Sequence, residues 1–315
     1  ICKVEILAED EDDLKKLVDL EERIKKQIFG QDKAVDEVTE AVQMASTGLI
    51  DDNKPMASLL FVGPTGVGKT EVAKVLSSEL GIPLIRFDMS EYAEKHTIAK
   101  LIGSPAGYVG YEDGGLLTDA IRKTPHCVLL LDELEKAHQD IYNILLQVMD
   151  YAVLSDNKGQ KADFRHVVII MTTNAGAQYA KQTIGFNNTI QSGDNMMKSV
   201  KSTFKPEFLN RLTSVTIFND MNKEMAELIL NKKLSTLESQ LLNKKIKLSI
   251  SSTAKEYLLQ VGFSPIYGGR EIDRVITSKV KPLIMRAILH GELRENMIAN
   301  IDFIEDRISL ICSKQ

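Results

Sequence analysis

Residues 58–70 of the 315-residue chain read Ser-Leu-Leu-Phe-Val-Gly-Pro-Thr-Gly-Val-Gly-Lys-Thr, and this stretch decides the fold. An apolar run typical of a buried strand leads into the pattern GxxxxGKT, and helical periodicity follows through Val72 and Leu76. A glycine-rich turn between a strand and a helix lets backbone N–H groups surround phosphates. We therefore predict nucleotide binding at Gly63, Pro64, Thr65, Gly66, Val67, Gly68, Lys69 and Thr70.

A second apolar run, Val128–Leu131, ends in the acidic pair Asp132 and Glu133. Parallel sheets bind ligands at the carboxyl ends of their strands, so both motifs point to one site. Lys69 is expected to reach the β and γ phosphates, and Thr70 and Asp132 to hold Mg²⁺, Asp132 partly through water. Glu133 is expected to polarise the attacking water. An acidic pair by itself is more often a solvated loop start.

Strand-like runs alternate with helical segments in the first two thirds of the chain, which predicts a parallel sheet flanked by helices on both faces. Beyond residue 219 helices dominate, with short strand candidates, so we expect a smaller, mostly helical domain carrying a short sheet. The expected divisions are an interdomain linker at 1–25, a large nucleotide-binding domain at 26–220 and a small domain at 221–315. The expected strands of the large domain are Ser58–Val62, Pro83–Phe87, Cys127–Leu131, Val167–Thr172 and Ser214–Phe218.

Composition narrows the function classes. There are 39 Lys and Arg against 44 Asp and Glu, a net charge of -5, which disfavours a protein whose main partner is nucleic acid. No apolar stretch approaches the ~20 residues that cross a bilayer, so no membrane partner is expected. Three isolated cysteines and a first residue that is Ile1 favour a cytoplasmic fragment of something longer.

The chain resembles the AAA+ ATPases and, among them, the Clp unfoldases, most closely the second, C-terminal ATPase module of the ClpA and ClpC type. The likeness spans nearly the whole chain. Its most distinctive stretches are 63–70, Arg86–Tyr92, Gly107–Gly110, Leu129–Ala137 and Met171–Gly176. The resemblance implies a P-loop AAA+ large domain, a small lid domain, ATP and Mg²⁺ as cofactors, ATP hydrolysis and a homo-hexamer.

Further residue roles come from the resemblance. Asn174 matches the polar sensor beside the γ-phosphate, although the residues alone also allow a turn-forming asparagine. Arg211 matches the arginine finger offered to a neighbouring subunit's ATP, although a lone arginine at a helix end is usually a surface cap. Arg270 matches the second sensor arginine of the small domain. It follows Gly268 and Gly269 where the family commonly has Gly-Ala, a departure that concerns helix entry.

Two loops bear on partners. Tyr108 and Val109 match the family's pore loop, which lines an axial channel and grips unfolded protein substrates; the residues alone equally allow a turn whose tyrosine is buried. Ile184, Gly185 and Phe186 resemble the loop that docks on the ClpP peptidase, although simple loop packing is also possible. The leading hypothesis is a hexameric unfoldase that threads substrates into ClpP. Alternatives are a ClpB-like disaggregase, a DNA-handling AAA+ loader and a nonhydrolysing scaffold.

Overall fold

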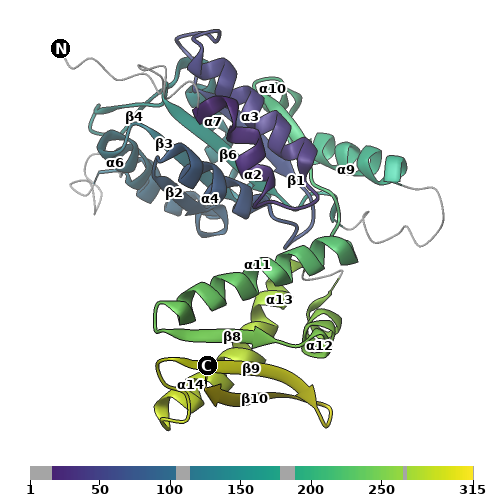
Figure 1. The fold of residues 1–315 in the computed structure, drawn as a ribbon. Coiled ribbons are helices and arrows are strands. Elements are labelled where there is room, and N and C mark those ends of the chain that lie inside the picture. Colours follow the sequence, from purple (N-terminus) through teal and green to yellow (C-terminus); the bar gives the residue numbers. More distant parts are fainter. Residues whose placement is uncertain (1–15, 104–113, 178–188, 265–267, 315) are drawn as a thin grey trace. The chain divides into compact units, whose positions relative to one another are not determined.

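The computed structural model describes residues 16–103, 114–177, 189–264 and 268–314, and for 189–192 the backbone alone (Figure 1). The chain divides into two compact units. The first comprises residues 1–64 and 68–219, and the second comprises 220–315 together with Thr65–Val67. The predicted linker at 1–25 lies largely outside the described residues and stays a prediction.

A five-stranded parallel sheet forms the centre of the first unit, in the order β2-β3-β6-β1-β7. The predicted α/β fold class is confirmed, and the expected strands agree with the observed ones to within one residue at each end. The strands are β1 (Ala57–Val62), β2 (Leu84–Asp88), β3 (Cys127–Asp132), β6 (Val167–Thr173) and β7 (Ser214–Ile217).

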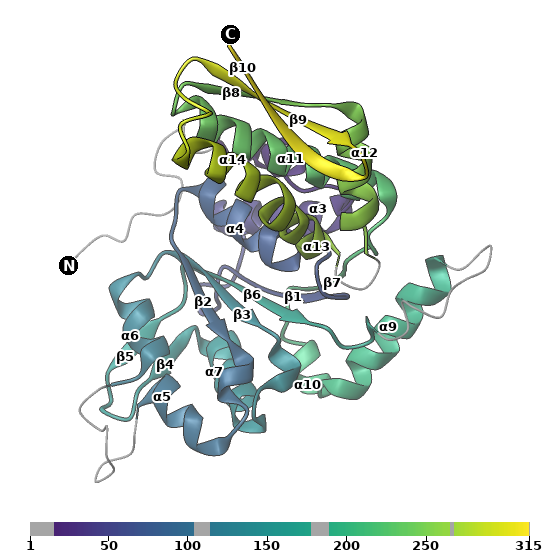
Figure 2. The ribbon, with the colours of Figure 1, turned by 90° about the horizontal axis from the view of Figure 1, so that it is seen from below.

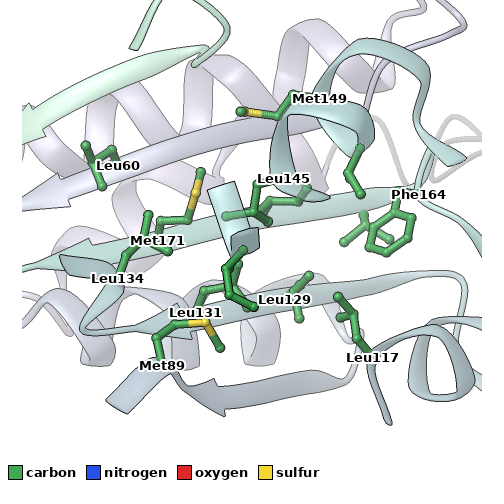
Figure 3. Packing of buried hydrophobic residues seen from close by; sticks show 14 of the residues in the cluster. Leu60, Met89, Leu117, Leu129, Leu131, Leu134, Leu145, Met149, Phe164 and Met171 are labelled. Atoms are coloured by element: carbon green, nitrogen blue, oxygen red, sulfur yellow. The ribbon is translucent and has the colours of Figure 1, made fainter. Parts of the chain in front are cut away.

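Helices cover both faces of this sheet, so β1, β3 and β6 are buried along their whole length. On one face α3 packs against β1 and β7, and α4 packs against β2, β3 and β6. On the other, Leu145 and Met149 of α7 lie over Leu60, Leu129 and Met171 (Figure 3). The helices are α2 (Leu20–Lys25), α3 (Asp32–Ser46), α4 (Lys69–Leu80), α5 (Ile98–Ile102), α6 (Leu116–Lys123), α7 (Gln139–Tyr151), α9 (Thr189–Thr203) and α10 (Pro206–Leu209), with 3₁₀ turns η1 (Met89–Tyr92), η2 (Lys95–Thr97) and η4 (Leu134–Lys136).

The second unit joins helices to a three-stranded sheet of order β10-β9-β8, in which β8 and β9 are parallel and β9 and β10 antiparallel (Figure 2). Between α13 and α14 the backbone forms the π-helical turn η5 (Ile276–Val280), which ends two residues before Pro282, whose ring removes a backbone donor. None of the helices in the described ranges is long and apolar enough to span a bilayer. The elements are α11 (Lys223–Leu242), β8 (Ile246–Ile250), α12 (Ser252–Gly262), α13 (Gly269–Val275), η5 (Ile276–Val280), α14 (Lys281–Leu289), β9 (Met297–Ile304) and β10 (Arg307–Lys314).

The sequence analysis did not anticipate a short hairpin of β4 (Val153–Ser155) and β5 (Lys161–Asp163). Its turn is organised by Asp156, whose carboxylate accepts the backbone N–H of Lys158 and Gln160 and pairs with Arg122 of α6. Asn157 donates from its backbone and side chain to the carbonyls of Ile102 and Gly103. The hairpin is thereby tied to the end of α5 and to α6.

We predict that Asp156→Asn destabilises the first unit by about 1–3 kcal/mol at neutral pH. Burial acts to raise the pKa of Asp156, but the hydrogen bonds from Gln160, Arg122 and Lys158 outweigh it, and the net pKa is lowered. A carboxyl group whose pKa is lower in the folded state than in the unfolded state stabilises the fold when the pH is above the unfolded-state pKa of about 4. That contribution is lost as the pH falls through the folded-state pKa. In urea unfolding, the free energies of unfolding of the wild type and the variant should therefore become equal as the pH falls. A difference in free energy of unfolding that does not change with pH would contradict this assignment.

Candidate functional site

The carboxyl ends of three neighbouring strands, β1, β6 and β3, bring the predicted site residues of the first unit together. β1 ends at Val62 and leads into the glycine-rich turn, β3 ends at Asp132, and β6 ends one residue before Asn174. Because the strands are parallel, residues far apart in sequence meet at one edge. The expected convergence of the two motifs is observed.

Lys69 is the first residue of α4 and is only 7% exposed. Its ammonium donates to the carbonyl oxygens of Gly63 at 2.5 Å and Pro64 at 2.8 Å, and to Oδ1 of Asn174 at 2.9 Å. Gly68 precedes it with φ near 108°, a backbone conformation that favours glycine. The turn therefore places a buried cation between the end of β1 and the residue that follows β6.

Asp132 ends β3 with a side chain only 8% exposed. Its Oδ1 accepts the hydroxyl of Thr172 at 2.5 Å, and Oδ2 pairs with Nη2 of Arg86 at 2.9 Å. The hydroxyl oxygen of Thr70 lies 3.3 Å from both carboxylate oxygens. Interactions from three different elements thus fix the orientation of this carboxylate.

The pair formed by Thr70 and Asp132 fits a magnesium ion. Mg²⁺ prefers oxygen ligands and usually keeps several waters, so one hydroxyl and one carboxylate at the phosphate-binding turn are a typical protein contribution. The observation that supports the fit is the 3.3 Å approach of the Thr70 hydroxyl to both oxygens of Asp132. The arrangement can hold an ion that arrives with nucleotide phosphates.

Glu133 adopts a left-handed backbone conformation with φ near 58°, which is uncommon for a residue other than glycine. Its backbone N–H donates to Thr172 Oγ1 at 3.1 Å, and the next residue, Leu134, is fully buried. These contacts stabilise the sharp turn after β3. The Glu133 carboxylate accepts from the Lys136 ammonium at 2.5 Å, and this hydrogen bond raises the pKa of Lys136.

Glu135 is a site residue that the sequence analysis missed. Its Oε1 accepts the backbone N–H of Asn174 at 3.1 Å, while its Oε2 is buried and has no hydrogen-bond partner in the described part of the chain. Together with the contact from Lys69, this bond fixes both the backbone and the side chain of Asn174. Glu135 and Arg86 both lie in stretches that carry the family resemblance, and that was the available signal.

The remaining predicted residues lie elsewhere in the first unit, in the second unit, or outside the described residues. Arg211 follows α10 and pairs with Asp150 of α7; the hydrogen bonds of the described residues do not join it to Lys69, Asp132 or Asn174. Arg270 is an exposed residue in the first turn of α13, in the second unit. The predicted pore-loop and docking residues lie outside the described residues; they are Tyr108, Val109, Ile184, Gly185 and Phe186.

Gly268 and Gly269, which stand where the family commonly has Gly-Ala, are compatible with the start of α13. A methyl group added at Gly269 would meet Met221 Cε at 3.4 Å and Ile229 Cδ1 at 3.6 Å, which is ordinary van der Waals contact. Gly268 has φ near 55°, where glycine is favoured. Of the two glycines, only Gly268 has a backbone conformation that favours glycine.

Comparison with known proteins agrees with this architecture. Residues 54–215 match the family model "AAA domain (Cdc48 subfamily)", and residues 221–301 match "C-terminal, D2-small domain, of ClpB protein". A fold with a parallel sheet, a phosphate-binding turn and an adjoining acidic pair defines a nucleotide-hydrolysing protein of the P-loop class. The chain belongs to the AAA family and is an ATPase module of the Clp type, as the sequence resemblance indicated.

Individual relatives support the same placement. The "ClpA homolog protein" of Fuscovulum blasticum is 44% identical over 300 residues, covering 95% of this chain and 38% of the relative. "Chaperone protein ClpB 2" of Nostoc sp. is 42% identical over 303 residues, covering 95% and 35%. The chain thus spans little more than a third of the length of these relatives.

A solved structure described as "Closed State CryoEM Reconstruction of Hsp104:ATPyS and FITC casein" shares the fold. It superposes with a TM-score of 0.87 at 32% sequence identity, over 96% of this chain and 53% of the solved chain. This chain is therefore similar to the Clp and Hsp104 chaperones.

Proposed function

We propose that the chain is the ATP-hydrolysing motor module of a cytoplasmic, hexameric Clp-type unfoldase that threads protein substrates through an axial pore. The observation that carries the proposal is the convergence of Lys69, Asp132 and Asn174 at one sheet edge, with Glu133 following directly. ATP binds at the glycine-rich turn, and Lys69 leaves its carbonyl partners to contact the β and γ phosphates. Thr70 and Asp132 would hold Mg²⁺, which would supply positive charge to the phosphates when bound.

Glu133 acts as the general base in this mechanism. Its carboxylate lies one residue beyond the metal-binding Asp132, its side chain is 27% exposed, and it pairs with the Lys136 ammonium. A water between Glu133 and the γ-phosphate loses a proton to this carboxylate. Asn174, fixed by Glu135 and Lys69, accepts or donates a hydrogen bond beside the same phosphate.

The two arginines complete the site in the proposed assembly. Arg211 is an exposed residue that follows α10, and a guanidinium supplied by a neighbouring subunit stabilises transition-state charge. Arg270 begins a helix of the second unit and couples the small domain to nucleotide state. The family membership and the exposure of both side chains support these roles.

Substrate gripping is proposed for Tyr108 and Val109. An aromatic and an aliphatic side chain between Gly107 and Gly110 suit apolar contact with an unfolded chain. The casein in the Hsp104 structure is that chaperone's protein ligand and favours the same class of substrate here.

Tyr108→Ala should separate hydrolysis from mechanical work. We expect ATP turnover within about twofold of wild type and unfolding slowed about tenfold or more, since truncating an aromatic anchor typically costs ~2 kcal/mol. The measurement follows loss of native fluorescence of a fluorescent protein with an unstructured tail, alongside phosphate release. Leu49→Ala, which removes an exposed apolar side chain elsewhere, is the control and should change neither rate. Unimpaired unfolding by Tyr108→Ala would discredit the gripping role.

A peptidase-linked unfoldase and a ClpB-like disaggregase share this motor. The segment Ile184–Phe186 favours delivery to a ClpP peptidase, whereas relatives named "Chaperone protein ClpB" favour the disaggregase. A binding assay with ClpP rings distinguishes them, with Phe186→Ser as the matched variant. Binding that is lost in the variant supports the peptidase partner. Absence of binding by the unmodified protein, with recovery of an aggregated enzyme, supports the disaggregase.

A further inference from the structure

Arg211 is held at two points in the first unit. Its Nε donates to both carboxylate oxygens of Asp150, at 2.7 Å and 2.8 Å, and its Nη1 donates to the carbonyl oxygen of Glu207 at 2.7 Å. Asp150 lies in the last turn of α7, 61 residues before Arg211 in the sequence, and Glu207 lies in α10. Two separate helices therefore fix the position of one guanidinium.

These contacts leave one edge of the guanidinium available. The group carries five N–H donors, one on Nε and two on each Nη. Asp150 engages the Nε donor and Glu207 one Nη1 donor, and Arg211 has no other hydrogen bond within the described residues. The three remaining donors are one on Nη1 and two on Nη2, and Nη2 has no hydrogen bond within the described residues, so the edge formed by Nη1 and Nη2 can still bind a ligand. This is the edge with which arginine binds phosphate oxygens through two parallel hydrogen bonds.

The ion pair contributes little to the fold. The Arg211 and Asp150 side chains are 37% and 35% exposed, and pairs that are so accessible to water typically add 0–1 kcal/mol to stability. An arginine side chain, however, has many rotamers, and ordering it before phosphate contact removes that cost from the reaction. Orientation is therefore what this contact can supply.

We infer that Asp150 is a positioning residue for ATP hydrolysis, which holds Arg211 from its Nε side so that the Nη edge faces the nucleotide phosphates of a neighbouring copy. The inference rests on the proposed role of Arg211. Asp150 itself does not touch the nucleotide; it acts through the arginine.

Asp150→Ala tests this by steady-state ATPase kinetics. We expect kcat to fall about tenfold with KM within twofold, because the arginine contributes to the transition state and not to ground-state binding. Asp150→Glu, which keeps the carboxylate, should recover most of the loss. The control is Asp163→Ala, since Asp163 makes a comparable exposed two-oxygen pair with Arg165 and should leave kcat unchanged. If the alanine variant folds poorly, the test is made with Asp150→Glu, provided that its assembly size and its unfolding midpoint equal those of the wild type.

Combination with Arg211→Ala separates the inference from its premise. If Asp150 acts through Arg211, adding Asp150→Ala to Arg211→Ala lowers kcat no further. A multiplicative further loss, or an Asp150→Ala variant with wild-type kcat beside an impaired Arg211→Ala, overturns the inference alone. A wild-type kcat in Arg211→Ala overturns the finger role itself.

Discussion

Replacing Glu133 by glutamine should leave ATP binding within about twofold of wild type and slow turnover ~100-fold or more. Glutamine has nearly the shape of glutamate but cannot accept the proton of the attacking water, and a general base contributes about 10²–10⁴ in rate. The contacts that form the phosphate site, from Lys69, Thr70 and Asp132, do not involve the Glu133 side chain. Binding and chemistry should therefore separate.

The measurement pairs a binding titration with a fluorescent ATP analogue and a single-turnover assay of phosphate release. Glu135→Gln is an informative companion, because the glutamine oxygen can still accept the Asn174 N–H. It should lower turnover much less than Glu133→Gln. Wild-type turnover in Glu133→Gln would remove the base assignment, and equal losses in the two variants would place the base role in doubt.

Arg211→Ala should lower kcat about 10³-fold, the effect typical of removing an arginine finger, with little change in KM. The residue lies on the surface and pairs with Asp150, so its loss should change the free energy of unfolding by less than ~1 kcal/mol. The assay is ATPase rate together with the unfolding midpoint in urea. Arg165→Ala is the matched control, since it removes another exposed, carboxylate-paired arginine.

Sequence alone predicted the parts of the site that follow directly from strands. Lys69, in its glycine-rich motif, and Asp132, at the end of an apolar run, could be placed because parallel strands end at a common edge, whereas the role of Asn174 came from the family resemblance. The same reasoning located each strand of the large sheet to within one residue. The local apolar pattern was sufficient for these elements.

Contacts between distant polar side chains could not be predicted in this way. Glu135 meets the backbone of Asn174, 39 positions later, and Asp150 meets Arg211, 61 positions later. Arg86 pairs with Asp132 because β2 and β3 are neighbours, which strand-like composition does not reveal. The hairpin of β4 and β5 was missed because its strands span three residues each, too short to show alternation.

The proposal that each ATP site is built from two neighbouring protomers is tested most directly by mixing two inactive variants. A Glu133→Gln protomer keeps its arginine, and an Arg211→Ala protomer keeps its base. In a randomly mixed assembly, about one interface in four combines an intact Glu133 from one protomer with an intact Arg211 from its neighbour. We expect an equimolar mixture to recover roughly a quarter of the wild-type ATPase rate. A mixture no faster than the two variants measured separately would contradict hydrolysis at a site built by two protomers.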